Sequence, residues 1–293
     1  MSEEFSSHGY EVFGTDITES KAPVWAMSSY EVMDMLNPEN VMTLIDSTKP
    51  DYIVNLAAIS SVGNSWHIPQ KTISVNINGT LNILEAVRKL ELRTRILLIG
   101  SSEEYAVSDS PISENYPLNA GNPYGISKIA QENFAEIYRA SYGLDIISTR
   151  TFNHTGIGQP DTFVLPSFVK QAAEIHNSGQ SGKIYVGNIS VRRDFGDVRD
   201  MVRAYRMILE SRTARKVFNV GSGFAHSLSE LLDYIVSLAS QKIEIVISAE
   251  KFRPSDNPVI WCDNSLLKSE TDWSAKYTVY DAIKSMFDAM TNH

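Results

Sequence analysis

Apolar runs alternate with amphipathic stretches along the first half of the chain. The apolar runs, each about as long as a buried strand, are Tyr10–Gly14, Tyr52–Ala58, Arg95–Gly100 and Leu144–Arg150. Stretches typical of helices lie between them, at Asn40–Ser47, Val75–Leu92 and Tyr124–Tyr142. Because the strands are apolar throughout rather than at every second residue, helices must cover both faces of their sheet. The pattern predicts an α/β fold with a doubly wound parallel sheet.

The pattern changes from about residue 153 onward. Gly, Pro, Asn and Ser become frequent and the elements shorten, although Met201–Glu210 and Leu228–Ser240 still indicate helices and Lys242–Ile247 a strand. We therefore expect a smaller, mixed α/β substrate lobe. The predicted dinucleotide-binding domain covers residues 1–154, with 189–222 returning to it, and the predicted substrate-binding lobe covers 155–188 and 223–293.

The composition is that of a globular protein. Of the 293 residues, 43% are hydrophobic and 21% are charged, so the chain can bury a core. With 26 basic and 35 acidic residues, the net charge is −9, and this negative field repels phosphate. We therefore expect neither nucleic-acid nor anionic-membrane binding, although local donors can still hold a phosphate group.

Cysteine and histidine exclude several kinds of site. Cys262 is the only cysteine, so an intramolecular disulfide is impossible, and the six histidines lack ligand spacing, so no metal site is expected. No stretch approaches the roughly 18 apolar residues of a membrane span. The first ten residues contain Glu3 and Glu4 and have no apolar signal core, so we expect a cytoplasmic protein.

The strongest chemical signal is the string Tyr124-Gly125-Ile126-Ser127-Lys128. Tyr124 and Lys128 are four residues apart, and on a helix they share one face. An ammonium beside a phenol favours the phenolate and is expected to lower its pKa from about 10 toward neutrality. Tyr124 is then a candidate proton donor and acceptor for interconverting a carbonyl and an alcohol. The alternative is an ordinary surface helix that carries a tyrosine and a lysine.

A second polar string, Gly100-Ser101-Ser102-Glu103-Glu104-Tyr105, follows the buried strand Arg95–Gly100 directly. In open α/β sheets, ligands bind beyond the carboxyl ends of the strands. A serine hydroxyl there can hold a substrate oxygen next to the tyrosine, and Glu103 can move a second proton. The alternative is that Ser101 and Ser102 only form a polar turn or cap the next helix.

Together these strings resemble the nucleotide-sugar branch of the extended short-chain dehydrogenase/reductase family. The resemblance covers nearly the whole chain and comes closest to GDP-6-deoxy-4-keto-mannose reductases and GDP-mannose 4,6-dehydratases. Six segments carry it: NLAAISSVGNSW (55–66), IGSSEEYA (99–106), NPYGISK (122–128), TRTFNHTGIGQ (149–159), VGNISVRRDFGDVRD (186–200) and RPSDNP (253–258). The Gly156-Ile157-Gly158 string departs from the family, which usually has a proline between these glycines.

The resemblance implies a catalytic set made of Ser101, Tyr124 and Lys128, with Asn76 supporting the lysine through hydrogen bonding. Tyr124 would protonate the C4 oxygen of the sugar, Ser101 would bind the keto oxygen, and Lys128 would hold the ribose hydroxyls of the cofactor. Glu103 matches the general base of the dehydratases, so its presence does not separate the two activities. In a reductase it would instead form a polar wall of the pocket.

The resemblance also implies a GDP-sugar substrate. Asn153 matches an asparagine near the sugar diphosphate, and Ser102 lies beside the catalytic serine. Arg193 and Arg253 match positions that hold the diphosphate, a role that suits the bidentate guanidinium group. Asp256 matches an acidic residue near the nucleoside ribose. The alternative for either arginine is a solvated or salt-bridged surface residue.

The glycine-rich turn that opens folds of this type is absent from the sequence. That turn and the helix after it hold the cofactor pyrophosphate. The chain opens with Met1–Tyr10, which resembles the end of the first helix of the family, so roughly 20 residues are expected to be missing, the central strand among them. Either the start codon is misassigned, or a true truncation weakens or abolishes cofactor binding.

The remaining cofactor residues lie after predicted strands. A carboxylate at Asp16 would accept hydrogen bonds from ribose hydroxyls and repel a 2′-phosphate, which favours NAD(H) over NADP(H); the alternative is a turn aspartate. The resemblance places Glu31 and Val32 near the adenine, although the family usually has Asp in place of the glutamate. Ala57 and Ala58 are small and allow the cofactor to approach the backbone.

We expect a reductase that converts GDP-4-keto-6-deoxy-D-mannose to GDP-D-rhamnose for polysaccharide synthesis. The alternatives are a GDP-mannose 4,6-dehydratase or related epimerase, and a non-catalytic nucleotide-sugar-binding protein if the cofactor turn is truly lost. The apolar faces of Val75–Leu92 and Tyr124–Tyr142 exceed what one sheet face needs. The resemblance implies that these helices form a four-helix interface in a homodimer.

Overall fold

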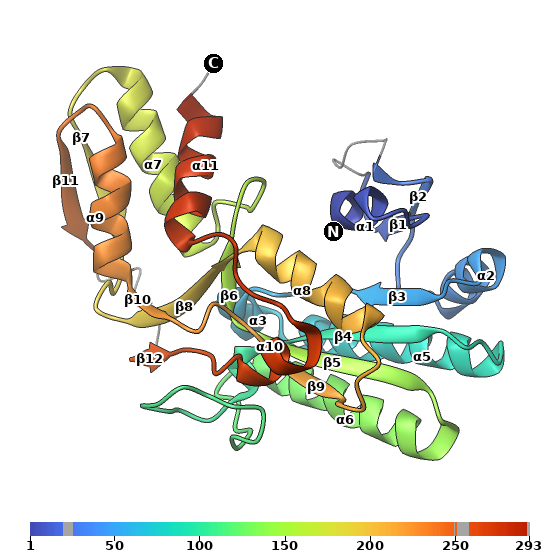
Figure 1. Cartoon of the computed structure of the whole chain (residues 1–293). Coiled ribbons are helices and arrows are strands. Elements are labelled where there is room, and N and C mark those ends of the chain that lie inside the picture. The colour runs from blue at the N-terminus through green and yellow to red at the C-terminus, as the bar shows by residue number, and fades with distance from the viewer. Residues whose placement is uncertain (20–25, 249, 251–257, 292–293) are drawn as a thin grey trace. The chain divides into compact units, whose positions relative to one another are not determined.

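The computed structural model describes residues 1–19, 26–248, 250 and 258–291. The chain divides into two compact units (Figure 1). Unit 1 consists of Met1–Ala106, Glu114–Thr151 and Val202–Phe218, and unit 2 of Val107–Ser113, Phe152–Met201 and Asn219–His293. This division follows packing within the protein. The predicted assignment of residues to cofactor and substrate domains concerns ligands and stays a prediction.

The main sheet of unit 1 has the strand order β3-β4-β5-β9. Its strands are β3 (Tyr52–Asn55), β4 (Arg95–Ser101), β5 (Asp145–Thr151) and β9 (Val217–Val220). β4 is parallel to both β3 and β5, with Arg95 opposite Tyr52 and Asp145. Three consecutive residues of β4, Ile96 to Leu98, are fully buried, as expected for a strand covered on both faces.

Helices cover this sheet on two sides, which confirms the doubly wound α/β fold. Figure 1 shows α5 (Gly79–Lys89) and α6 (Pro123–Tyr142) on one side and α8 (Val198–Glu210) on the other. The core on the α5 and α6 side also includes α2 (Pro38–Thr48). A π-helical turn, η2 (Ser74–Asn78), precedes α5, so the predicted helix Val75–Leu92 is formed by η2 and α5 together.

The first elements of unit 1 are α1 (Ser2–Ser7), β1 (Phe13–Asp16) and β2 (Ser29–Val32). Among the described strands, β1 pairs in parallel with β2 in a separate two-stranded sheet. The strand expected at Tyr10–Gly14 begins three residues later and ends at Asp16. Two short helices, α3 (Val62–His67) and α4 (Pro69–Ile73), follow β3.

Unit 2 is the expected smaller lobe with mixed sheets. In its larger sheet, β8 (Arg192–Asp197) is antiparallel to β10 (Ala225–Ser227) and parallel to β12 (Val259–Ile260) and β6 (Asn153–Thr155). A second sheet pairs β7 (Gly182–Val186) with β11 (Ile243–Ile247) in parallel. Among its described residues, four helices lie wholly within the unit: α7 (Val164–Ser178), α9 (Leu228–Leu238), α10 (Ser265–Thr271) and α11 (Val279–Thr291).

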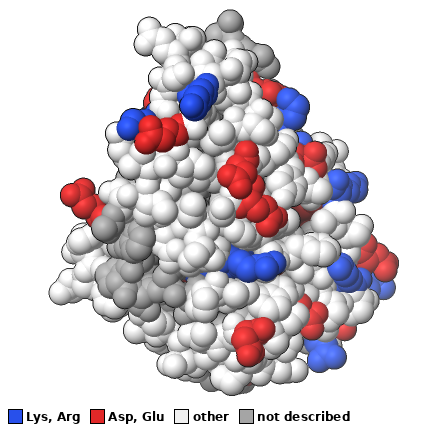
Figure 2. Space-filling view, turned by 90° about the vertical axis from the view of Figure 1, so that its left-hand side faces the viewer, with Lys and Arg blue, Asp and Glu red and all other residues white. Residues whose placement is uncertain are grey.

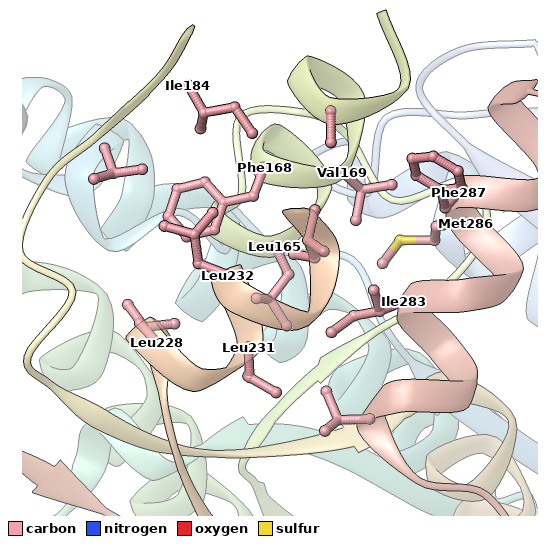
Figure 3. Packing of buried hydrophobic residues seen from close by; sticks show 14 of the residues in the cluster. Leu165, Phe168, Val169, Ile184, Leu228, Leu231, Leu232, Ile283, Met286 and Phe287 are labelled. Atoms are coloured by element: carbon pink, nitrogen blue, oxygen red, sulfur yellow. The ribbon is translucent and has the colours of Figure 1, made fainter. Parts of the chain in front are cut away.

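The apolar faces of α7, α9 and α11 pack together in the core of unit 2 (Figure 3). On α9, Leu228, Leu231, Leu232 and Ile235 recur at the spacing of one helical face, and all four are buried. Ile283 of α11 is fully buried in the same cluster. The helix expected at Leu228–Ser240 is therefore present as α9, and its apolar face packs in this core.

Charged groups lie mainly on the surface. On the face shown in Figure 2, acidic and basic side chains are interspersed. Among the described residues, no helix has the length and apolar character that crossing a bilayer requires.

The core of unit 2 generates a first prediction. Ile283→Ala removes a fully buried side chain and should lower the free energy of unfolding by roughly 2–5 kcal/mol, because a cavity remains. Ile157→Ala makes the same change at an exposed loop residue and should stay within about 0.5 kcal/mol of the unchanged protein. Urea-induced unfolding followed by circular dichroism measures both, and equal midpoints would contradict the packing.

Candidate active site

The carboxyl end of β4 and the first turn of α6 position the candidate catalytic groups of unit 1. β4 ends at Ser101 and continues into a single 3-10 turn, η3 (Ser102–Glu104). The Ser101 hydroxyl accepts a hydrogen bond from the Glu103 backbone N–H at 3.2 Å, which starts this turn. α6 begins with Pro123 after Asn122, whose side chain accepts a hydrogen bond from the Gly125 N–H at 2.9 Å.

The η3 turn lies directly against the first turn of α6. A Cβ atom on Gly125 would lie 2.3 Å from the Glu103 carbonyl oxygen, so only glycine allows this approach. The Asn122 amide nitrogen also donates to the Glu103 carboxylate at 2.8 Å. These contacts bring the side chains of Ser101 and Tyr124 close together, so that the Ser101 hydroxyl favours the charged form of the phenol.

The structure corrects the expected effect on the Tyr124 phenol. Tyr124 is only 8% exposed, and burial raises the pKa of its hydroxyl above the ordinary value, against the smaller opposing effect of the Ser101 hydrogen bond. Burial disfavours the charged phenolate, and this outweighs any help from a nearby cation. The prediction of a pKa lowered toward neutrality is therefore wrong for the protein without ligands.

Lys128 lies on the same face of α6, as its spacing from Tyr124 predicted. Its Nζ atom is 5.9 Å from the centroid of the Tyr124 ring. The amine donates to the Ile99 carbonyl oxygen at 2.7 Å and to the Gln131 side-chain oxygen at 3.1 Å. Burial lowers the pKa of Lys128 to about 8, because the charged amine has lost its contact with water.

Asn76 is fully buried in the η2 turn and contacts α6 without reaching the lysine by a described hydrogen bond. Its amide nitrogen donates to the Ser127 hydroxyl at 2.8 Å, and its oxygen accepts from the Ile59 N–H at 2.8 Å. The Ser127 hydroxyl in turn donates to the Tyr124 carbonyl oxygen. Asn76 thus fixes the helix turn that presents the tyrosine, and its support for Lys128 is indirect.

Two residues of this site were missed in the sequence. Gln131 contacts the Lys128 amine directly, and its position three residues further along α6 could have indicated this. The carboxylate of Glu104 accepts a hydrogen bond from the Ser101 N–H at 2.7 Å. The Ser-x-x-Glu pattern of a capping box was present in the string 101–104 and could have indicated this contact.

The candidate cofactor residues lie at the ends of strands in unit 1. Asp16 ends β1, is exposed, and lies opposite Val32 of β2, while Glu31 lies opposite Thr15. Beyond β3, the Ala57 N–H donates to the Asn55 side chain at 3.2 Å, so a tight polar turn leads into Ala57 and Ala58. An exposed carboxylate can accept hydrogen bonds from ribose hydroxyls, and small residues at strand ends leave room for the cofactor. Both features suit a dinucleotide.

The candidate substrate residues are in both units. Ser102 is buried in η3 of unit 1. In unit 2, Asn153 begins β6 opposite Phe195 of β8, two residues from Arg193, so these two candidates lie on adjacent strands. Arg253 and Asp256 lie outside the described residues. Among the residues that are described, no group of His, Cys, Asp and Glu side chains could hold a metal ion.

Buried Asp194 fixes the strand that carries Arg193. Its carboxylate accepts hydrogen bonds from the backbone N–H groups of Ser222, Gly223 and Cys262, at 2.8, 2.9 and 3.1 Å, and from the Ser222 hydroxyl. Burial raises the pKa of Asp194, while these hydrogen bonds oppose the rise. Three segments of unit 2 therefore meet at the position next to Arg193.

Comparisons with known proteins show which family the chain is similar to. The family model described as GDP-mannose 4,6 dehydratase matches residues 1–286. A GDP-6-deoxy-D-mannose reductase of Pseudomonas aeruginosa is 30% identical over 256 residues, which are 86% of this chain and 84% of that protein. GDP-mannose 4,6 dehydratase 1 of Arabidopsis thaliana is 30% identical over 261 residues, covering 87% and 72% of the two chains.

Solved structures place the fold among the same proteins. A structure of RMD from P. aeruginosa in complex with NADPH superposes with a TM-score of 0.85 at 26% identity, covering 97% of this chain and 99% of that one. The Rossmann-like fold expected from the sequence is thereby confirmed. The resemblance to nucleotide-sugar enzymes of the extended short-chain dehydrogenase/reductase type is confirmed as well.

The buried lysine generates a prediction that needs no ligand. Between the folded pKa of about 8 and the ordinary value of 10.5, the unfolded chain binds more protons than the folded one, so stability should rise with pH. The free energy of unfolding should therefore increase from pH 8 to 10 relative to a Lys128→Met variant. Urea unfolding at several pH values measures this difference.

Lys268→Met removes an exposed lysine and serves as the matched control for the loss of one positive charge. If the free energy of unfolding changes equally in the unchanged protein and in Lys128→Met over this pH range, the lowered pKa of Lys128 is contradicted.

Proposed function

This chain belongs to the GDP-mannose 4,6-dehydratase family, and from that membership we propose that it reduces GDP-4-keto-6-deoxy-D-mannose to GDP-D-rhamnose. Members of this family are nucleotide-sugar dehydratases and reductases, and the chain is an enzyme of this extended short-chain dehydrogenase/reductase type. The reductase and the dehydratase relatives are equally identical to it, at 30%, so the choice between activities depends on the site.

The observation that carries the reductase proposal is the burial of the Tyr124 hydroxyl beside Ser101. Burial holds the pKa of this phenol above its ordinary value, so at neutral pH it keeps its proton. Reduction of a ketone needs a proton donor at the forming hydroxyl, whereas dehydration begins by removing a proton from the C4 hydroxyl. The free protein therefore holds Tyr124 in the form that reduction uses.

Each group has a defined task in this proposal. The hydroxyls of Ser101 and Tyr124 lie close to each other, and a keto oxygen that binds next to both can accept a hydrogen bond from each. A reduced nicotinamide, when bound, supplies the hydride. Tyr124 gives its proton to the oxygen, and the charge of Lys128 stabilises the phenolate that remains.

We propose NAD(H) rather than NADP(H) as the cofactor. A nicotinamide dinucleotide is supported by the NADPH complex of RMD. The exposed carboxylate of Asp16 supports the finer choice, because it would repel a 2′-phosphate and accept hydrogen bonds from the free ribose hydroxyls. Glu31, Val32, Ala57 and Ala58 would line the adenosine side.

The GDP-sugar would be held by Ser102 and Asn153 near the sugar and by Arg193 at the diphosphate. Arg253 and Asp256 remain proposals from the family resemblance for the diphosphate and the nucleoside ribose. Arg193 is 8% exposed, on a strand that Asp194 fixes, which suits a guanidinium group that holds phosphate rather than a solvated arginine. We also propose a cytoplasmic location and a role in polysaccharide synthesis, as the resemblance implies.

A GDP-mannose 4,6-dehydratase is the second candidate, and the position of Glu103 is compatible with it. Its carboxylate is hydrogen-bonded to Asn122 beside Ser101, where a second acid–base group of a dehydratase would act. Turnover of GDP-mannose without added reductant would support this activity over the reductase.

We propose that the enzyme is a homodimer formed through α6 and its neighbours. Ile126, Ala130, Ile137 and Ala140 lie on one face of α6, and the two isoleucines are 53% and 52% exposed. Ile73 of α4 is a further exposed apolar residue of unit 1. A second copy would cover such a face with the same face of its own, as in a two-fold interface.

The reductase proposal predicts loss of NADH absorbance when the purified chain meets GDP-4-keto-6-deoxy-D-mannose. Tyr124→Phe should lower kcat by on the order of 10²–10⁴, because it removes the proton donor. Tyr142→Phe makes the same change at the exposed end of α6 and should leave kcat unchanged. No NADH consumption by the chain, with GDP-mannose turned over instead, would replace this proposal by the dehydratase.

The dimer proposal predicts that Ile137→Glu shifts the protein to a monomer, since each interface would then bury two like charges. Ile157→Glu introduces the same charge at an exposed loop of unit 2 and should leave the dimer intact. Sedimentation velocity measures both masses. A monomeric unchanged protein, or a dimer that survives Ile137→Glu, would refute this interface.

A further inference from the structure

One buried acidic residue beside the active site has no task in the proposed reaction. Glu104 is 0% exposed, and its Oε1 atom accepts a hydrogen bond from the Ser101 N–H at 2.7 Å. A Cβ atom on Gly100 would lie 2.4 Å from this oxygen and 2.3 Å from the Thr149 carbonyl oxygen. The carboxyl group therefore lies directly over Gly100, where the side chain of any other residue would collide with it.

The second oxygen of Glu104 is poorly satisfied. No described residue forms a hydrogen bond with Oε2, and Arg150 Nε lies 3.9 Å away. The Arg150 guanidinium donates instead to the Glu132 carboxylate, the Tyr105 hydroxyl and the Glu114 carbonyl oxygen. Because the ion pair with Arg150 is long and has no hydrogen bond, it does not by itself account for a carboxylate buried at this position.

Lys128 provides the remaining explanation. The hydrogen bonds described for its amine go to the neutral oxygens of Ile99 and Gln131. The amine is hydrogen-bonded to the carbonyl oxygen of Ile99, and the Glu104 carboxyl group lies over Gly100, the next residue of β4, so the two groups lie at adjacent residues of the strand. Glu104 is also the carboxyl group that raises the pKa of Lys128, against the larger effect of burial. Glu103 carries the neighbouring carboxylate, which is bonded to Asn122.

We propose that Glu104 is a positioning residue of the active site, which holds the Ser101 backbone at the end of β4 and acts as the buried counter-charge of Lys128. The proposal rests on the proposed function for the roles of Ser101 and Lys128. The charged or titratable groups around Glu104 are Arg150 on β5, Tyr124, Lys128 and Glu132 on α6, and Glu103 and Tyr105 on its own turn and directly after it.

The two partners titrate in the same range. Burial raises the pKa of Glu104 to about 8, and Glu132 adds to the rise while Arg150 and Lys128 oppose it. As the pH increases through 8, Glu104 becomes negative and favours the charged form of Lys128. The counter-charge thus extends the pH range over which Lys128 stays positive.

The test is a titration of Lys128 by NMR, in protein whose lysines are labelled with carbon-13 at Cε. In Glu104→Gln, the Lys128 signal should titrate roughly one pH unit lower than in the unchanged protein, because the counter-charge is lost. Glu103→Gln removes the adjacent carboxylate and should leave the Lys128 titration in place. An unchanged titration in Glu104→Gln would overturn the proposal.

A second pair of variants separates the two tasks. Gln keeps an oxygen that can accept from the Ser101 N–H, whereas Leu removes it. Under the proposed function, Glu104→Gln should move the alkaline limb of the kcat/KM profile to lower pH, and Glu104→Leu should also lower kcat where Lys128 is charged. Equal profiles for the Gln and Leu variants would overturn the role in holding Ser101.

The NMR titration needs no turnover, so failure of the reductase proposal leaves this test intact. If Glu104→Gln does not fold, the carboxyl carbon of Glu104 provides the readout. Since the interaction is reciprocal, Glu104 should titrate at higher pH in Lys128→Met than in the unchanged protein, and an unchanged Glu104 titration would overturn the proposal.

Discussion

The close approach of the η3 turn to the first turn of α6 is the contact on which the candidate site depends. Gly125 permits it, because a side chain there would strike the Glu103 carbonyl oxygen. The approach buries Tyr124 against Ser101 and places Lys128 beneath the end of β4. Burial then sets the protonation of both groups: the phenol keeps its proton, and the lysine becomes easier to deprotonate.

Much of this architecture could be predicted from local patterns. Apolar runs such as Arg95–Gly100 indicate buried parallel strands, and the four-residue spacing of Tyr124 and Lys128 places them on one helix face. The protonation of Tyr124 could not be predicted in the same way, because it depends on how much water the fold excludes. Nor could the partners of Lys128, since the Ile99 carbonyl reaches the amine only when β4 and α6 pack.

The arrangement of the substrate residues could not be predicted from local sequence patterns either. That Asn153 and Arg193 lie on adjacent strands follows from the pairing of β6 with β8, which no local pattern determines. Next to Arg193, the buried carboxylate of Asp194 accepts hydrogen bonds from residues of two further segments of unit 2. In the string Arg193-Asp194-Phe195 only the arginine was predicted to have a function, although the aspartate is the residue that joins neighbouring segments by hydrogen bonds.

A buried phenol with a raised pKa is at first sight a poor acid–base catalyst, because its phenolate is costly to form. In a reduction, however, the phenol is needed with its proton in place, and the phenolate forms only as that proton passes to the substrate oxygen. A positive charge close by lowers the cost of forming the phenolate, so Lys128 matters most as Tyr124 becomes negative. The buried carboxyl group of Glu104 favours the charged form of the lysine at that step. Burial therefore determines the protonation of both groups in this site, and the hydrogen bonds at the end of β4 determine which groups are buried together.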